Sequence, residues 1–245
     1  MMRQGPIQVS YRFDSNFTKL GKQLLIFYGV IYVLELVCEH WLNIPVVAFL
    51  QLYPLQHPDF RFWQVITHPF IHDPTAPIAF LINSIVFYFF SGSIESSLGA
   101  RRFLILFYSS ALGSAVCGLL LSSVTGFHQP FMGMLSSLLS LVVIFGLLNP
   151  ETSILLFFVL PVKAKYISYG TILVTVLTFL AKANPYGAYH LGGILIGWMY
   201  WIGPDHFFSL SRLHMHYLEW RLKKKKSRFR VINGKKNDND KPTLH

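Results

Sequence analysis

The sequence predicts an all-α, polytopic membrane protein: a bundle of six transmembrane helices with both termini in the cytoplasm. Of the 245 residues, 53% are hydrophobic and only 13% are charged, about half the charged share of an average soluble domain. Six apolar runs are long enough, or nearly long enough, to cross about 30 Å of hydrocarbon as helices. Lys and Arg are also divided unequally between the two sides that six crossings define.

The six apolar runs give the expected helices in chain order. The connection at residues 43–77 is much longer than the others, so we expect an ordered loop that lies partly in the membrane interface. The apolar stretch 154–161 ends at a proline, and we expect it to be re-entrant or to lie at the surface. We place the helices at residues 24–42, 78–94, 103–123, 132–148, 166–181 and 188–202.

The placement of the basic residues predicts the orientation. If alternate connections are assigned to one side, 19 of the 21 Lys and Arg residues share the side of the two termini, and only Arg61 and Lys182 lie opposite. Cytoplasmic loops are the ones enriched in Lys and Arg, so both termini are expected inside. The densest basic cluster, residues 223–226, is expected to contact anionic lipid. Charges that collect at chain ends and in short loops do not indicate a nucleic-acid partner.

Three parts follow from this pattern. Residues 1–22 form a cytoplasmic segment without the short apolar core and cleavage site of a signal peptide. Residues 23–205 form the membrane domain, and residues 206–245 form a basic cytoplasmic tail. Cys38 and Cys117 both lie in apolar runs, where we interpret them as small core residues, and no pattern supports a disulfide.

Polar residues within the apolar runs are the candidates for function. A histidine in a membrane helix is costly and marks a functional site by default, which singles out His190. A serine beside a base becomes a nucleophile, and Ser136 lies in another apolar run. Under the expected topology, Asn83, Ser136 and His190 lie roughly 7, 9 and 6 Å along three helices that start at the outer face, at about 1.5 Å per residue. The shared depth predicts a serine hydrolase site within the bilayer.

Small residues on the same helices favour close packing at this site. Gly193 and Gly197 follow His190 at i+3 and i+7, and therefore share its helix face. Ser136 and Ser140 belong to a similar stripe. Faces of small residues let membrane helices approach closely, so we expect a serine hydroxyl to reach the imidazole.

Several motifs along residues 60–200 together indicate a family. They are Phe62-Trp63-Gln64 with Thr67-His68-Pro69-Phe70-Ile71-His72, then Asn83, then Gly92-Ser93-Ile94-Glu95-Ser96-Ser97-Leu98-Gly99, then Gly133-Met134-Leu135-Ser136-Ser137, and finally His190-Leu191-Gly192-Gly193 with Gly197. In this order the chain resembles the rhomboid intramembrane serine proteases.

The resemblance implies a six-helix fold and a Ser–His dyad without an acidic third member. His190 would take the proton from Ser136, and the Ser136 backbone N–H and the Asn83 amide would hold the oxyanion. Substrates would be transmembrane proteins cleaved near the outer end of a helix weakened by Gly or Pro, with no metal or cofactor. Glu95 and Gly99 would be structural. The compact core resembles bacterial forms, which implies the bacterial inner (plasma) membrane.

The chain departs from the family pattern at three positions. The histidine usually found four residues before the asparagine, a second oxyanion donor, is Ala79 here, with His72 the available substitute in a stretch about two residues longer than usual. The glycine after the nucleophile is Ser137, and the aromatic residue four positions after it is Ser140. Losing one oxyanion donor slows an enzyme by about 10² to 10³.

Other functions stay open at this point. A catalytically inactive rhomboid-like protein that binds transmembrane helices would have the same fold, and Ala79 favours it. A small transporter could line a polar path with His190 and Asn83, but the inner halves of the expected helices 132–148 and 188–202 are almost wholly apolar. A metal site at His68, His72 and Asp73 lacks a convincing third ligand.

Overall fold

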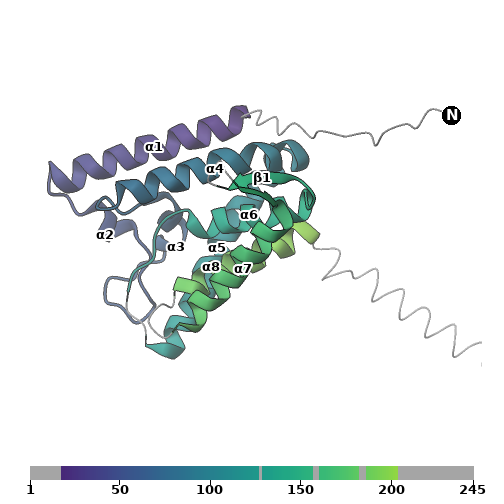
Figure 1. Cartoon of the computed structure of the whole chain (residues 1–245). Helices are drawn as coiled ribbons and strands as arrows, with labels where there is room; N and C mark the ends of the chain where they lie inside the picture. The colour runs from purple at the N-terminus through teal and green to yellow at the C-terminus, as the bar shows by residue number, and fades with distance from the viewer. Residues whose placement is uncertain (1–17, 127–128, 157–159, 182–185, 204–245) are drawn as a thin grey trace, which may run out of the picture. The chain divides into compact units, whose positions relative to one another are not determined.

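The computed structural model describes residues 18–126, 129–156, 160–181 and 186–203. Within these residues the protein is mainly helical, with one two-stranded sheet (Figure 1). The elements are α1 (Lys19–His40), α2 (Val46–Leu50), α3 (Gln64–Thr67), the 3₁₀ turn η1 (His68–Phe70), α4 (Pro77–Leu98), α5 (Ala100–Thr125), α6 (Leu135–Leu148), β1 (Ser153–Leu156), β2 (Leu160–Lys163), α7 (Ala164–Leu180) and α8 (Tyr186–Ile202).

Each of the six expected apolar runs coincides with one helix, with shifts of a few residues at the ends. These helices are α1, α4, α5, α6, α7 and α8. By length and composition, α1, α4 and α5 could each cross a membrane, whereas α6 and α7 are shorter apolar helices. Six crossings and cytoplasmic termini therefore stay predictions. The expected tail at residues 206–245 and nearly all of the segment 1–22 lie outside the described residues.

The start of α6 differs from the expectation of a helix over residues 132–148. Gly133 has a φ of +93°, in the left-handed region that favours glycine, and its backbone N–H donates to the His68 carbonyl over 2.9 Å. The helix therefore begins at Leu135. Ser136 is consequently the second residue of α6 and not a residue more than one turn inside it.

The long connection 43–77 is ordered, as predicted. It contains α2, α3 and η1, and Leu52 forms an isolated antiparallel bridge with Phe131. The buried Gln64 side chain organises the loop, since its Oε1 accepts from the Arg61 N–H over 3.0 Å and its Nε2 donates to the Asp59 carbonyl over 3.0 Å. A buried amide whose donor and acceptor are both paired fixes the backbone around it.

The stretch expected to be re-entrant or at the surface is part of an antiparallel hairpin. Strand β1 pairs with β2 in the register Ser153↔Lys163 to Leu156↔Leu160. Leu155 and Leu160 are both exposed, so this hairpin lies at the surface. It is also the part of the described structure that departs from an all-α fold.

Glycines set the packing around α8. A Cβ on Gly192 would lie 2.7 Å from the Gly113 carbonyl of α5, and a Cβ on Gly118 would overlap the Tyr189 ring. On the α6 side, a Cβ on Gly193 would lie 3.0 Å from that of Ser136, and one on Gly197 would overlap the Ser140 hydroxyl. The prediction that small residues bring these helices into close contact is confirmed.

The outer faces of the helices carry the apolar side chains that a lipid environment requires. Residues such as Ile26 and Val33 of α1, Ile78 of α4 and Leu173 of α7 are exposed, and α1 lies beside α4 (Figure 1). Large exposed apolar patches are rare on soluble monomers. The fold therefore presents apolar side chains outward, and between its helices it packs a large apolar cluster together with buried serines.

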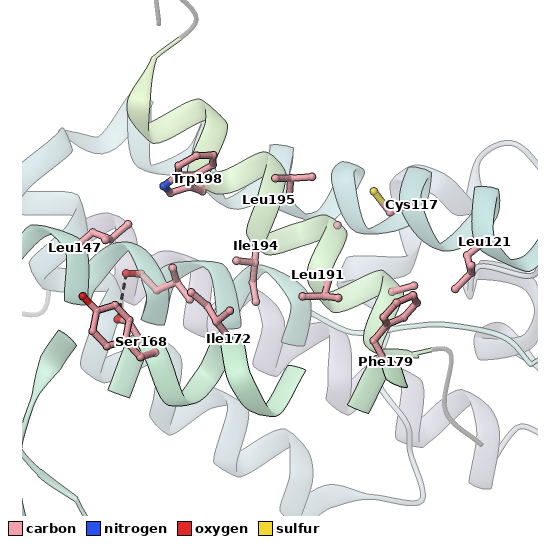
Figure 2. A pocket seen from close by; sticks show the side chains of 14 residues that line it. Cys117, Leu121, Leu147, Ser168, Ile172, Phe179, Leu191, Ile194, Leu195 and Trp198 are labelled. Carbon is pink, nitrogen blue, oxygen red and sulfur yellow. Dashed lines mark hydrogen bonds between the residues drawn. The ribbon is translucent and has the colours of Figure 1, made fainter. Parts of the chain in front are cut away.

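An apolar cavity of about 550 Å³ lies among α5, α6, α7 and α8 (Figure 2). Figure 2 shows Leu191 and Ile194 pointing into it from α8, with Ile172 on α7. The single hydroxyl hydrogen of Ser168 at its edge is within reach of the carbonyls of Val142 and Val143, so this hydroxyl is already paired. The lining is mainly apolar, and neither Ser136 nor His190 borders this cavity. Cys117 borders the cavity, is half-buried and forms no disulfide among the described residues.

Candidate active site

Ser136 and His190 are in hydrogen-bond contact. The Ser136 Oγ lies 2.9 Å from the His190 Nδ1. Ser136 is the second residue of α6, and His190 is the fifth residue of α8. Ser136 is 1% exposed, whereas His190 is partly buried. The serine hydroxyl can donate to this nitrogen when the imidazole proton is on Nε2. This is the arrangement of a nucleophile and its general base.

The position of Ser136 at the start of α6 adds an electrophilic element. The first N–H groups of a helix have no intrahelical acceptor. In α6 the first helical hydrogen bond runs from the Leu138 N–H to the Met134 carbonyl. The Ser136 N–H is therefore one of these unpaired donors. The partial positive charge at a helix N-terminus favours a negative ligand there. The same residue thus presents a hydroxyl and a backbone donor.

Hydrogen bonds between helices hold the first turn of α6. The Ser137 hydroxyl donates to the Phe107 carbonyl of α5 over 2.8 Å, and the Ser110 hydroxyl donates to Ser140 over 3.0 Å. All of these side chains are buried. The serines at positions 137 and 140, which depart from the family pattern, therefore attach α6 to α5 just after Ser136.

An aromatic ring that the sequence analysis did not single out contacts the histidine. The Phe131 ring centroid lies 5.7 Å from that of His190, with an interplanar angle of 63°. Phe131 is 3% exposed and precedes the turn at Gly133. One phenylalanine among 22 in an apolar chain carries no sequence signal that would have identified it.

His68 and His72 lie in the loop near the same turn. The His68 Nδ1 is 3.1 Å from the Gln64 carbonyl, whereas neither ring nitrogen of His72 has a hydrogen-bond partner among the described residues. Burial lowers the pKa of both imidazoles to about 4, because a low-dielectric environment disfavours the charged form. The described residues bring together no group of three or more His, Cys, Asp or Glu side chains that could hold a metal.

The family model of the Rhomboid domain matches residues 59–203, which include the dyad and more than half of the chain. This protein belongs to the rhomboid family. No curated protein matches the chain. The resemblance predicted for residues 60–200 is confirmed. As a rhomboid it is an integral membrane protein, and either an intramembrane protease or an inactive relative of one.

Asn83 is a predicted site residue of this rhomboid, but no described hydrogen bond connects it to the dyad. It is half-buried in the second turn of α4, a helix that packs against α6. No hydrogen bond joins it to Ser136 or His190 among the described residues. Its role in holding an oxyanion stays a prediction. Ala79, one turn earlier, is exposed.

The two residues of this rhomboid expected to be structural do have structural contacts. Glu95, near the end of α4, accepts a hydrogen bond from the Thr18 hydroxyl at the N-cap of α1. Gly99 has a φ of +81° and is the single residue between α4 and α5. A side chain at that φ would be strained. These positions therefore fix the ends of three helices and not the chemistry.

Proposed function

We propose that this rhomboid is an intramembrane serine endopeptidase that cleaves transmembrane segments of membrane proteins through the dyad of Ser136 and His190. The observation that carries the proposal is the 2.9 Å contact between the Ser136 Oγ and the His190 Nδ1. It is supported by the location of both residues inside the matched Rhomboid domain. Neither metal nor cofactor enters the reaction.

The reaction begins with proton transfer from the Ser136 hydroxyl to the His190 Nδ1. The resulting alkoxide attacks the carbonyl carbon of a peptide bond, and the negative charge moves to the carbonyl oxygen. The Ser136 N–H, at the N-terminus of α6, and the Asn83 amide would stabilise this oxyanion, and one such donor is typically worth about 3–4 kcal/mol of the barrier. The C–N bond then breaks, His190 returns the proton to the leaving amine, and water hydrolyses the acyl-enzyme.

The membrane arrangement is part of the same proposal. We infer six crossings with both termini in the cytoplasm of a bacterium, whose inner membrane would hold the protein. The basic tail would lie against anionic lipid. The support is the placement of 19 of the 21 Lys and Arg residues on one side. A C-terminal alkaline phosphatase fusion should be inactive and a C-terminal GFP fusion fluorescent. The opposite pair of results would reverse the orientation.

A second candidate is a catalytically inactive rhomboid that binds transmembrane helices. Ala79 favours it, because the exposed methyl group there cannot donate a hydrogen bond. The paired Ser136 and His190 weigh against it, since a binding protein has no need of an activated serine.

Covalent labelling separates the two candidates. Purified protein in detergent is treated with a fluorophosphonate probe, and the wild type is compared with Ser136→Ala, His190→Ala and the control Ser140→Ala. We expect labelling of the wild type and of Ser140→Ala, and none of the other two. A folded wild type that takes no label contradicts the protease and favours the helix-binding protein.

A further inference from the structure

A single hydrogen bond does not fix the orientation of His190. The terminal torsion of a histidine side chain has a broad energy minimum, so the imidazole can turn away from Ser136 unless something blocks it. Among the described residues, the aromatic ring in contact with it is Phe131, at 5.7 Å and 63°. This is the edge-to-face geometry that aromatic pairs prefer.

Phe131 is itself held on several sides. Its ring stacks on Tyr189 at 4.2 Å and 15°, and the Tyr189 ring occupies the space over Gly118 of α5. The Phe131 backbone exchanges two hydrogen bonds with Leu52, of 2.8 and 2.9 Å. Leu52 is fully buried. The Phe131 ring is therefore restrained by these contacts, and its position depends on the loop 43–77.

Helix α6 has no room for an aromatic residue beside the dyad. Ser140, one turn beyond Ser136, accepts the Ser110 hydroxyl over 3.0 Å. A single Cβ on Gly197 of α8 would already overlap the Ser140 side chain. Because α6 and α8 are in such close contact, position 140 accepts only a small residue. The aromatic contact to the imidazole comes instead from the segment before the turn at Gly133.

We propose that Phe131 is a positioning residue that holds the His190 imidazole toward Ser136. Through its bridge to Leu52, it also makes the dyad geometry dependent on the conformation of the loop 43–77. The expected effect on the labelling rate rests on the proposed protease function. The restraint on the imidazole itself is independent of catalysis. A misplacement of about 1 Å in a catalytic group can cost about 10²-fold in rate.

The test compares Phe131→Leu with Phe131→Tyr and the control Phe60→Leu. Phe60 packs against the same apolar cluster but has no described ring contact with His190, so Phe60→Leu matches the loss of volume. The fluorophosphonate reaction is measured over a range of probe concentrations, which separates the maximal labelling rate from the apparent probe affinity. The thermal unfolding midpoint of each variant is recorded alongside.

We expect Phe131→Leu to lower the maximal labelling rate about tenfold or more with little change in probe affinity. Phe131→Tyr, which keeps the ring, should retain most of the rate, and Phe60→Leu should retain it fully. A normal rate in folded Phe131→Leu overturns the proposal. An equal loss in Phe60→Leu also overturns it, because the effect would then be one of general packing. If Phe131→Leu does not fold, Phe131→Tyr decides the question. Because this variant keeps the ring, loss of the labelling rate in folded Phe131→Tyr would overturn the proposal.

A second measurement does not depend on enzymatic activity. Diethyl pyrocarbonate modifies accessible imidazoles, and mass spectrometry of the peptide containing His190 gives its rate of modification. This rate should rise in Phe131→Leu and stay at the wild-type value in Phe60→Leu. If the wild type takes no fluorophosphonate label, the protease function fails while this result still tests the positioning role. Equal modification rates in all variants would overturn that role.

Discussion

The Ser137 hydroxyl donates a 2.8 Å hydrogen bond to the Phe107 carbonyl, so α6 is attached to α5 one residue after Ser136. Both residues are buried. The oxygen that receives this bond is a main-chain group of α5, which makes the contact insensitive to the side chain at position 107. Ser137 thus contributes to the location of Ser136 without contacting His190 in any described hydrogen bond.

Ser137→Ala should destabilise the protein by about 1 kcal/mol, the usual net value of one intramolecular hydrogen bond. It should also slow fluorophosphonate labelling, because the first turn of α6 becomes less restrained. Unfolding in detergent with increasing denaturant measures the first effect. Ser96→Ala is a matched control, since Ser96 donates to the Ser93 carbonyl on an exposed face of α4. Equal stability of the two variants would contradict this role for Ser137.

Gly197→Ala should destabilise the protein by about 1–3 kcal/mol, the usual cost of adding atoms to a well-packed interior. The added methyl group would overlap the hydroxyls of Ser140 and Ser110, so these hydroxyls would have to rotate out of their hydrogen bond and α8 would be pushed away from the Ser140 Cβ. Because this movement also lengthens the Ser136–His190 contact, labelling should fall. Thermal unfolding and labelling of the same preparation measure both effects.

The control for that variant is Gly170→Ala on α7. A Cβ at Gly170 meets no atom within 4 Å, and alanine is favoured over glycine in a helix by about 1 kcal/mol. Gly170→Ala should therefore be neutral or slightly stabilising. A similar loss of stability in both variants would show that the close contact of α8 with α6 is not the cause.

The helix positions were predictable because hydrophobic runs follow directly from the need to face lipid, and all six runs are helical. The approach of Ser136 to His190 was predictable from their shared depth and their glycine neighbours. The start of α6 was not, because hydropathy does not detect the positive φ of Gly133. The contact of Phe131 with His190 was not predictable either, for a different reason. It depends on a two-residue bridge between Leu52 and Phe131, and a pairing so short leaves no periodic pattern.

Acid should destabilise the protein between about pH 6.5 and pH 4. The pKa of His72 is lowered by burial from 6.5 to about 4 in the folded protein, so the unfolded chain binds the proton more readily. Stability that depends on the neutral imidazole is fully present above pH 6.5 and is lost as the pH falls toward 4. His68, with a pKa lowered to about 4 in the same way, adds to the effect.

His72→Phe should reduce this acid sensitivity. Both ring nitrogens of His72 are unpartnered among the described residues, and the rings of Tyr28 and Phe80 lie edge-on to it at 5.6 and 5.0 Å, so a phenyl ring should fit. Unfolding midpoints at pH 7 and pH 5 measure the change. Labelling should persist, and its loss in folded His72→Phe would instead identify His72 as the donor that Ala79 does not supply.

Asn83→Ala should slow the reaction by about 10² to 10³, the usual effect of removing one oxyanion donor, while the folded protein stays intact because Asn83 has no described hydrogen bond to lose. The reciprocal change, Ala79→His, places an imidazole one turn earlier on α4 at an exposed position where it has room. If the site lacks a second side-chain donor, this variant should label faster than the wild type. The double variant should recover part of the rate lost in Asn83→Ala. Labelling unchanged in Asn83→Ala would leave the Ser136 N–H as the principal donor, since it is fixed by the start of α6 and needs no side chain on α4.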